Sequence, residues 1–149
     1  MRPLLFAMIV LAVFGMGVAG YLTYAHFDEA ALVCAIGGCE TVQESDYSTI
    51  GPLPIAALGL GMFMGLTLAA AYRLTSPGRA HREKVSILVW ALLLTGILYY
   101  LYLTYVELFV LNAVCQWCVI SSIIALAIFA IESVYLWRTV MDADSYSAG

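Results

Sequence analysis

The chain has 149 residues, of which 64% are hydrophobic and only 11% are charged. Soluble domains are about 45–50% apolar and about 25% charged, so this composition excludes an ordinary soluble fold and makes lipid the expected solvent. The formal net charge of −4 is unevenly spread, and no basic run or patch indicates a nucleic-acid partner.

Four apolar segments follow one another along the chain. They cover about residues 4–24, 53–72, 85–110 and 115–137. Each is long enough to cross a ~30 Å hydrocarbon core as a helix, and none alternates apolar and polar residues as a barrel strand does. We therefore expect an all-α integral membrane protein. It would be a four-transmembrane-helix bundle of one domain, residues 1–149, with no fused thioredoxin-like domain.

The first segment has an alternative interpretation as a cleaved signal peptide. Arg2 gives a basic start, and Val18-Ala19-Gly20 is weakly similar to a cleavage site. The apolar stretch is longer than a usual signal-peptide core, so we favour a retained transmembrane helix.

The basic residues predict the orientation of the helices. All six precede the first segment, lie between the second and third, or follow the fourth: Arg2, Arg73, Arg79, Arg82, Lys84 and Arg138. With four crossings these places share one side, which the positive-inside rule makes the cytoplasm. We expect a multi-pass protein of the cell inner (cytoplasmic) membrane with both termini in the cytoplasm.

A long loop of about residues 25–52 joins the first two segments on the opposite, extracytoplasmic side. It carries five acidic residues and no basic one. Loops of this length are usually functional or carry structure of their own. The Asp46–Ile50 stretch predicts a short interfacial helix that ends at Gly51-Pro52.

The second apolar segment contains a pair of glycines spaced for close helix contact. Gly61 and Gly65 form a GxxxG pair, which lets two helix backbones approach. We expect packing inside the bundle here, with a dimer interface as the alternative.

All four cysteines fall on the outer side, where disulfides form and persist. Cys115-Gln116-Trp117-Cys118 opens the fourth segment, and a helix N-terminus lowers the pKa of a thiol placed there. The spacing puts both sulfurs on one helix face, with Cys118 about 4.5 Å deeper along the axis. We expect Cys115 to face the aqueous boundary and Cys118 to face the membrane.

The second pair, Cys34 and Cys39, is separated by four residues that include Gly37-Gly38. The two glycines supply a tight turn, and a disulfide needs Cα atoms about 4.4–6.8 Å apart. A ring this short gives little loop-closure stabilisation, so it suits a bond that opens and closes better than one that braces a fold.

Three other interpretations of the cysteines stay open at this point. One is a pair of static disulfides, for which four cysteines allow three pairings. Another is a zinc site, which needs tetrahedral convergence and normally matched CxxC pairs. The third is buried free cysteine. We expect no metal site, and His26 and His81 lie on opposite sides of the membrane.

The cysteine pattern resembles the vitamin K epoxide reductase family in its bacterial form. The resemblance spans essentially the whole chain, and its motif comprises Cys34, Cys39, Ser45, Tyr47-Ser48, Gly51, Pro54 and the helix-initial Cys115-x-x-Cys118. The DsbB family also has four helices and two cysteine pairs, but its CxxC lies in the first outer loop. The order here is reversed.

The resemblance implies a quinone-dependent thiol oxidoreductase that generates disulfides. A separate thioredoxin-like or DsbA-like protein outside the cytoplasm would pass electrons to Cys34. Cys39 would then exchange with Cys115, and Cys118 would form a transient adduct with a membrane quinone of the ubiquinone, menaquinone or vitamin K type. Ser45 would help to shape the site near Cys39, with a turn or capping hydroxyl as its alternative role.

The chain departs from the animal members of that family. They carry a tyrosine four residues after the CxxC, where this chain has Ser122, and an asparagine near the start of the second helix, which this chain lacks. These side chains contact vitamin K. Plain quinone reduction is therefore favoured, and vitamin K quinone or epoxide reduction is the alternative.

The quinone would need an apolar pocket with a few hydrogen-bond donors. Ser121 and Ser122 lie three and four residues after Cys118 and share its helix face, so we expect a quinone contact from one of them. Bonding to their own helix is the alternative. Some tyrosines of the third segment are candidates to line this pocket: Tyr99, Tyr100, Tyr102 and Tyr105. Glu107 and Glu132 lie near interfaces in this interpretation and receive no catalytic role.

Two other functions compete with the enzyme. A transmembrane carrier of reductant needs a thiol that is reachable from the cytoplasm, and the expected topology provides none. A non-enzymatic membrane protein with structural disulfides gives no reason for a CxxC at a helix start aimed into the bilayer.

Overall fold

The computed structural model describes residues 1–35, 37–75 and 78–147. Its long helices are α1 (Arg2–Phe27), α3 (Ile55–Thr75), α4 (Arg79–Val106) and α5 (Gln116–Ser147). A π-helix, η3 (Glu107–Leu111), continues α4. Four helical segments are long and apolar enough to cross a membrane: Arg2–Phe27, Ile55–Thr75, Ala80–Leu111 and Gln116–Met141. The expectation of a mostly helical membrane protein with four such helices is confirmed.

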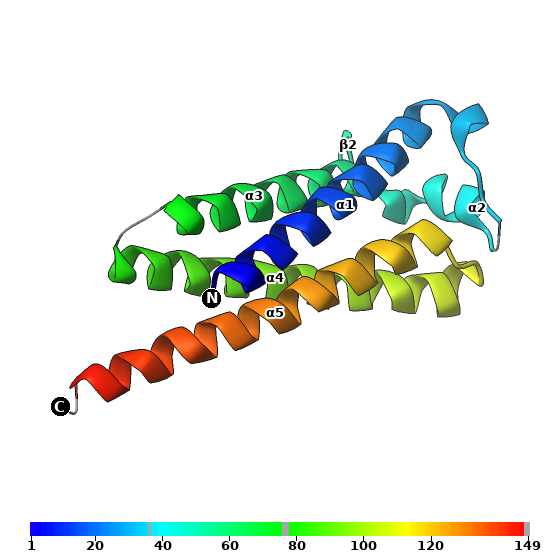
Figure 1. Ribbon diagram of the computed structural model, residues 1–149. Helices are drawn as coiled ribbons and strands as arrows, with labels where there is room; N and C mark the ends of the chain where they lie inside the picture. The colour runs from blue at the N-terminus through cyan, green and yellow to red at the C-terminus, as the bar shows by residue number, and fades with distance from the viewer. Residues whose placement is uncertain (36, 76–77, 148–149) are drawn as a thin grey trace.

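The bundle has two distinct ends (Figure 1). The start of α1, the end of α3, the start of α4 and the end of α5 lie at one end, and the short elements between α1 and α3 lie at the other, beside the start of α5. Helix α1 packs against both α3 and α5, and α4 packs against α5. The cysteine-bearing segments therefore meet at one end of the bundle.

Helix α1 shows how the apolar sequence divides between core and lipid. Its buried residues recur at helical spacing along one face: Leu5, Met8, Ala12, Gly15, Val18, Ala19, Leu22 and Ala25. Large apolar side chains such as Phe6, Val10 and Phe14 are exposed on the other faces. A helix that is apolar all round is expected where lipid is the solvent of its outer face.

A close contact between α1 and α3 depends on Gly15. A Cβ atom built at Gly15 would lie 2.6 Å from the ring of Phe63, a fully buried residue of α3. We expect Gly15→Ala to lower the free energy of unfolding by about 1–3 kcal/mol, because the ring has no free space to move into. Thermal unfolding in detergent measures this. Gly17→Ala in the same helix is the matched control, since its Cβ would meet nothing within 4 Å. Equal stabilities of the two variants would contradict the prediction.

The expected packing role of the GxxxG pair is wrong. Cβ atoms at Gly61 and Gly65 would meet nothing within 4 Å, and both residues are exposed. The close approach of α1 and α3 occurs instead at Gly15, on the face of α3 that carries Phe63.

The segment between α1 and α3 carries short elements of its own. They are η1 (Glu29–Ala31), α2 (Cys39–Gln43), η2 (Asp46–Ser48), β1 (Thr49–Ile50) and β2 (Leu53–Pro54). The two strands pair antiparallel, and Gly51 makes the turn between them with a φ of +63°.

This segment corrects two expectations from the sequence. The all-α class omits the small hairpin of β1 and β2. The helix expected at Asp46–Ile50 ends at Ser48, because Thr49 and Ile50 are extended and pair with the strand that follows the turn at Gly51.

A buried ion pair joins three helices at a position where we expected exposed charges. Arg73 lies inside α3 and Glu132 inside α5, with exposures of 1% and 0%, so neither belongs to a loop or an interface. Arg73 Nη1 donates to both carboxylate oxygens of Glu132 at 2.7 and 2.9 Å. It also donates to Ser86 Oγ of α4 at 2.8 Å, and Ser86 Oγ donates to Glu132. Charges buried away from water need partners of this kind. The residues that surround Arg73 and Glu132 in the sequence give no sign that the two side chains pair.

Candidate functional site

The CxxC pair lies at the beginning of α5, as the sequence predicts. Cys115 directly precedes the first helical residue, and its carbonyl oxygen accepts a hydrogen bond from Val119 N at 3.1 Å. Cys118 lies one turn further on, and both residues are free thiols. Cys115 is fully buried, so the expectation that it faces the aqueous boundary is wrong.

The surroundings of Cys115 favour its thiolate. Hydrogen bonding from the Cys118 thiol lowers the pKa of Cys115 below its usual value. Backbone N–H groups of Cys118 and Trp117 at the helix start act in the same direction, against the opposing effects of burial and of the Glu107 charge. Cys115 is therefore the thiol of this pair prepared to exchange with another sulfur.

The loop cysteines form a disulfide. Cys34 and Cys39 are bonded to each other, with their Cα atoms 6.1 Å apart. Cys39 begins α2 and is buried at 1% exposure, whereas Cys34 is half-buried. Cys39 and Cys115 belong to the same buried cluster, and Cys34 and Cys118 pack against it.

Two glycines let this loop lie directly on the segment that precedes Cys115. Gly37 has a φ of +96°, and a Cβ there would overlap the carbonyl oxygen of Val114. A Cβ at Gly38 would lie 2.7 Å from the Cβ of Ala113. The Gly37-Gly38 step thus makes a turn, as expected, and also permits the close approach that covers Cys115.

The outer loop is tied to the CxxC helix by aromatic side chains. The Tyr21 hydroxyl accepts a hydrogen bond from Val33 N at 2.8 Å and donates to Ala31 O at 2.9 Å. The ring of Tyr21 lies 5.0 Å from that of Trp117, centroid to centroid. Trp117 Nε1 donates to Val33 O at 2.9 Å. These bonds hold the residue before Cys34 against the first turn of α5.

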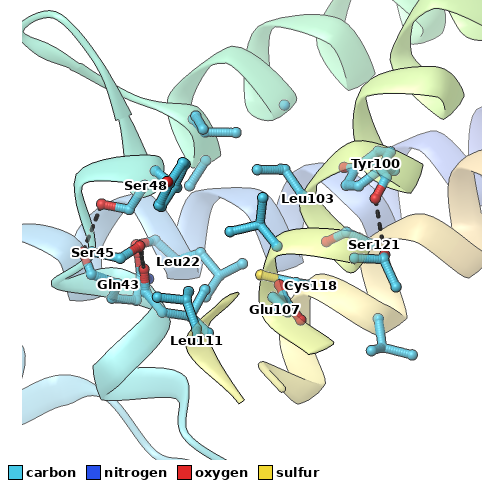
Figure 2. A pocket seen from close by; sticks show the side chains of 18 of the residues that line it. Leu22, Gln43, Ser45, Ser48, Tyr100, Leu103, Glu107, Leu111, Cys118 and Ser121 are labelled. Carbon is cyan, nitrogen blue, oxygen red and sulfur yellow. Dashed lines mark hydrogen bonds between the residues drawn. The ribbon is translucent and has the colours of Figure 1, made fainter. Parts of the chain in front are cut away.

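Glu107 is the functional candidate that the sequence reasoning missed. It is 5% exposed at the start of η3, and its Oε2 accepts a hydrogen bond from Cys115 N at 3.3 Å. Its carboxylate also lies beside the Cys118 sulfur, where both side chains line the same cavity (Figure 2). The sequence did contain one signal for this role: Glu107 is a carboxylate at the end of an apolar segment, eight residues before the CxxC. The π-turn that aims it inward has no sequence signature here.

A cavity of about 80 Å³ lies against Cys118, several times the space that one water needs. Figure 2 shows the Cys118 sulfur and the Glu107 carboxylate side by side at this pocket. Most of its lining is apolar and comes from all four long helices, including Leu22, Gly59 and Leu103.

The polar groups of the cavity are few. Tyr100 of α4 and Ser121 of α5 face one another across it (Figure 2). Ser121 Oγ is buried, and the Tyr100 hydroxyl is its hydrogen-bond partner across the cavity, as the dashed line in Figure 2 marks. Ser122 does not line the cavity, because its Oγ donates to Val119 O of its own helix at 2.8 Å. Of the two serines expected near the quinone, the structure brings Ser121 to Cys118.

Ser45 lies at the loop side of the same cavity. Its Oγ donates to Val42 O at 2.7 Å, which is the turn role that the sequence left open. It also lines the cavity together with Ser48, whose Oγ donates to Gln43 O at 2.7 Å (Figure 2). Ser45 therefore shapes the end of α2, the helix that begins at Cys39.

Within residues 1–35, 37–75 and 78–147, no group of three or more His, Cys, Asp or Glu side chains is arranged to hold a metal ion. The arrangement that the described residues do provide is a disulfide, a dithiol and an apolar cavity in one place. A disulfide beside a dithiol supports thiol–disulfide exchange.

Comparison with known families gives one match. The model of the Vitamin K epoxide reductase family matches residues 6–133, a range that holds all four cysteines and every residue that lines the cavity. Comparison with curated proteins gives no match.

Proposed function

Because the chain belongs to the vitamin K epoxide reductase family, whose members are oxidoreductases that link thiols to quinones, we propose that it generates disulfides with a membrane quinone as electron acceptor. Electrons pass from a separate thioredoxin-like protein to Cys34 and Cys39, then to Cys115 and Cys118, and finally to the quinone. The quinone is the second substrate.

One observation carries this proposal. The oxidised pair and the reduced pair meet at one buried cluster, and Cys118 of the reduced pair is the cysteine that lines the apolar cavity. The dithiol is thus beside the space for the quinone, and the disulfide is on the loop side. This distribution is the one expected immediately before the quinone is reduced.

The accessibility of the loop sulfurs supports their order. A partner's thiolate attacks a disulfide at the sulfur it reaches, which is the half-buried Cys34 and not the buried Cys39. The Cys39 thiolate released by that attack then exchanges with Cys115 once Cys115 and Cys118 are oxidised. The partner resolves its bond to Cys34 and leaves as a disulfide.

The quinone fits the cavity on two grounds. The lining is mostly apolar, as a quinone ring requires, and the buried Ser121 Oγ borders the same space as a polar atom on the α5 side. Tyr100 adds a second hydroxyl on the same side. Ser121 is therefore the contact that we propose for a quinone oxygen.

Plain quinone reduction is favoured over epoxide reduction. At the position of the animal tyrosine this chain has Ser122, whose hydroxyl is bonded within α5 and does not line the cavity. No asparagine lines the cavity either.

The proposed orientation places both termini in the cytoplasm of a cell with an inner membrane. Arg73 is buried in an ion pair, whereas Arg2, Lys84 and Arg138 are exposed and remain available for the positive-inside rule. The start of α1, the end of α3, the start of α4 and the end of α5 share one end of the bundle, opposite α2 and the start of α5 (Figure 1).

The test is quinone reduction by the full chain in proteoliposomes. With a DsbA-type protein in its dithiol form and ubiquinone or menaquinone, we expect one quinol for each partner disulfide formed. Cys34→Ala should abolish this partner-driven turnover. The same variant, reduced beforehand, should still convert one equivalent of quinone, because Cys115 and Cys118 are intact. Quinone absorbance and partner thiol titration measure the two products.

Two outcomes would refute the proposal. In one, the wild-type protein leaves both quinones oxidised. In the other, Cys34→Ala sustains the wild-type rate with the partner protein as donor, which would mean that electrons bypass the loop disulfide.

A further inference from the structure

Quinone reduction by a dithiol moves two protons as well as two electrons. The attacking thiol must lose its proton before it is a nucleophile, and the quinol oxygens must each gain one. The site around Cys118 is mostly apolar and Cys118 is only partly exposed, so we expect a protein group beside its sulfur to carry at least the first proton. This inference rests on the proposed function.

Glu107 is placed for that transfer. Its carboxylate lies beside the Cys118 sulfur and lines the same cavity, together with Tyr100 and Ser121 (Figure 2). It is the only carboxylate among the residues that line this cavity. Glu107 is only 5% exposed, so bulk water has little access to its carboxylate.

The backbone around Glu107 is built to hold it there. The chain leaves the α-helix at Val106, makes the π-turn of η3, and ends it at Asn112, which has a left-handed φ of 49°. Ala113 N donates to the Glu107 carbonyl oxygen at 3.0 Å. π-turns are uncommon and often found at functional sites. The fixed hydrogen bond from Cys115 N to Oε2 leaves the other carboxylate oxygen for Cys118 or for a ligand.

We propose that Glu107 is a catalytic proton carrier, which takes the proton from Cys118 Sγ and delivers it to an oxygen of the quinone bound in the cavity.

The steps balance as follows. The Cys118 S–H proton moves to the Glu107 carboxylate, and the Cys118 thiolate forms a carbon–sulfur bond to the quinone. The negative charge that this addition places on a quinone oxygen is neutralised by the proton of Glu107, which becomes a carboxylate again.

The Cys115 thiolate then attacks Cys118 Sγ and forms the disulfide. The carbon–sulfur bond breaks, and its electron pair completes the two-electron reduction of the ring. The proton lost by Cys115 goes to the second oxygen. One dithiol is oxidised and one quinone is reduced to quinol.

The titratable groups that face Glu107 are few. Cys115 and Cys118 come from the start of α5, Tyr100 from α4 and Tyr47 from η2, and the lining residues of α1, α2 and α3 are uncharged. No Lys or Arg lines the cavity. If the reaction rate falls at low pH because a carboxylate in this site is protonated, that carboxylate is therefore Glu107.

The experiment compares Glu107→Gln with the wild type in a single turnover. Protein reduced beforehand is mixed with ubiquinone across a range of pH, and quinone absorbance is followed. Glutamine keeps the size of the side chain and still accepts from Cys115 N, so the helix start is preserved. We expect a loss of about 10²-fold in rate, because a positioned acid–base group contributes this much.

The pH profile separates proton transfer from packing. The wild-type rate should fall at low pH, as Glu107 becomes protonated and can no longer accept a proton, and this limb should be absent in Glu107→Gln. Glu107→Asp keeps a carboxylate, and should retain the limb with a rate at least about tenfold above that of Glu107→Gln. Glu83→Gln, at the opposite end of α4, is the matched control and should behave as wild type.

The assignment of Glu107 is overturned if Glu107→Gln reduces quinone at the wild-type rate with the wild-type pH profile, or if Glu107→Asp is no better than Glu107→Gln. These results would leave the proposed function standing. A wild-type protein that reduces no quinone would instead overturn the proposed function and this assignment with it.

Discussion

Cys118→Ala is expected to reduce the rate of quinone reduction by on the order of 10³-fold or more, the largest loss among the single changes considered. Cys118 is the only sulfur among the residues that line the cavity, so no other thiol can take its place. The measurement is the fall in quinone absorbance with protein reduced beforehand. The Cys34–Cys39 disulfide should still exchange with a partner dithiol, since the loop is tied to α5 through Trp117 and not through Cys118.

Cys115→Ala is the matched comparison for this variant. It should also fail to turn over, but for a different reason: Cys118 can still attack the quinone, and no second thiol releases it. Mass spectrometry of the intact protein should therefore find quinone retained on Cys115→Ala and none on Cys118→Ala. Retention on Cys118→Ala, or full activity of either variant, would show that the relay runs in another order.

The helices and the positions of the two cysteine pairs were accessible from the sequence because both are local. An apolar run of about 20 residues has few alternatives to a membrane helix, and the position of a CxxC at the start of such a run follows from the run itself. The helix N-terminus of α5 appears where Cys115 predicted it. Gly37-Gly38 predicted the turn that the loop disulfide needs.

What the sequence could not predict depends on how distant segments pack. From spacing alone, Ser121 and Ser122 were equally good candidates for a quinone contact near Cys118. The structure distinguishes them, because Ser121 lines the cavity and the Ser122 hydroxyl bonds within its own helix. From the sequence, Cys115 is expected to face water. In the structure it is buried, because Gly37 and Gly38 of the loop lie against Val114 and Ala113.

Glu107 illustrates the same limit in one side chain. In a continuous α-helix its direction would follow from its position along α4, but the π-turn rotates it toward Cys118. Neither its burial nor its partners can be seen in the neighbouring sequence. A carboxylate close to a membrane interface is ordinarily expected to be solvated, but Glu107 is buried in the structure.

Glu132→Leu is expected to lower the free energy of unfolding by about 3–5 kcal/mol, because it leaves the buried Arg73 guanidinium without its counter-charge. Arg73 has no route to water at 1% exposure, and it already holds an Nη2 group without a described hydrogen-bond partner. Its remaining contacts are the Ala69 carbonyl, Ser86 and the ring of Tyr135, 5.2 Å below it. Thermal or denaturant unfolding of the purified protein in detergent measures the loss.

The double variant Arg73→Met, Glu132→Leu distinguishes an unpaired charge from a general loss of packing. Apolar side chains of similar volume remove both charges at once, and replacing a buried ion pair in this way is often neutral or stabilising. Most of the stability lost in Glu132→Leu should therefore return in the double variant, which makes the two changes strongly non-additive. If the double variant were less stable than Glu132→Leu, the pair would act mainly through shape. If Glu132→Leu were as stable as wild type, Arg73 would not depend on the buried contacts with Glu132 and Ser86 that the structure shows.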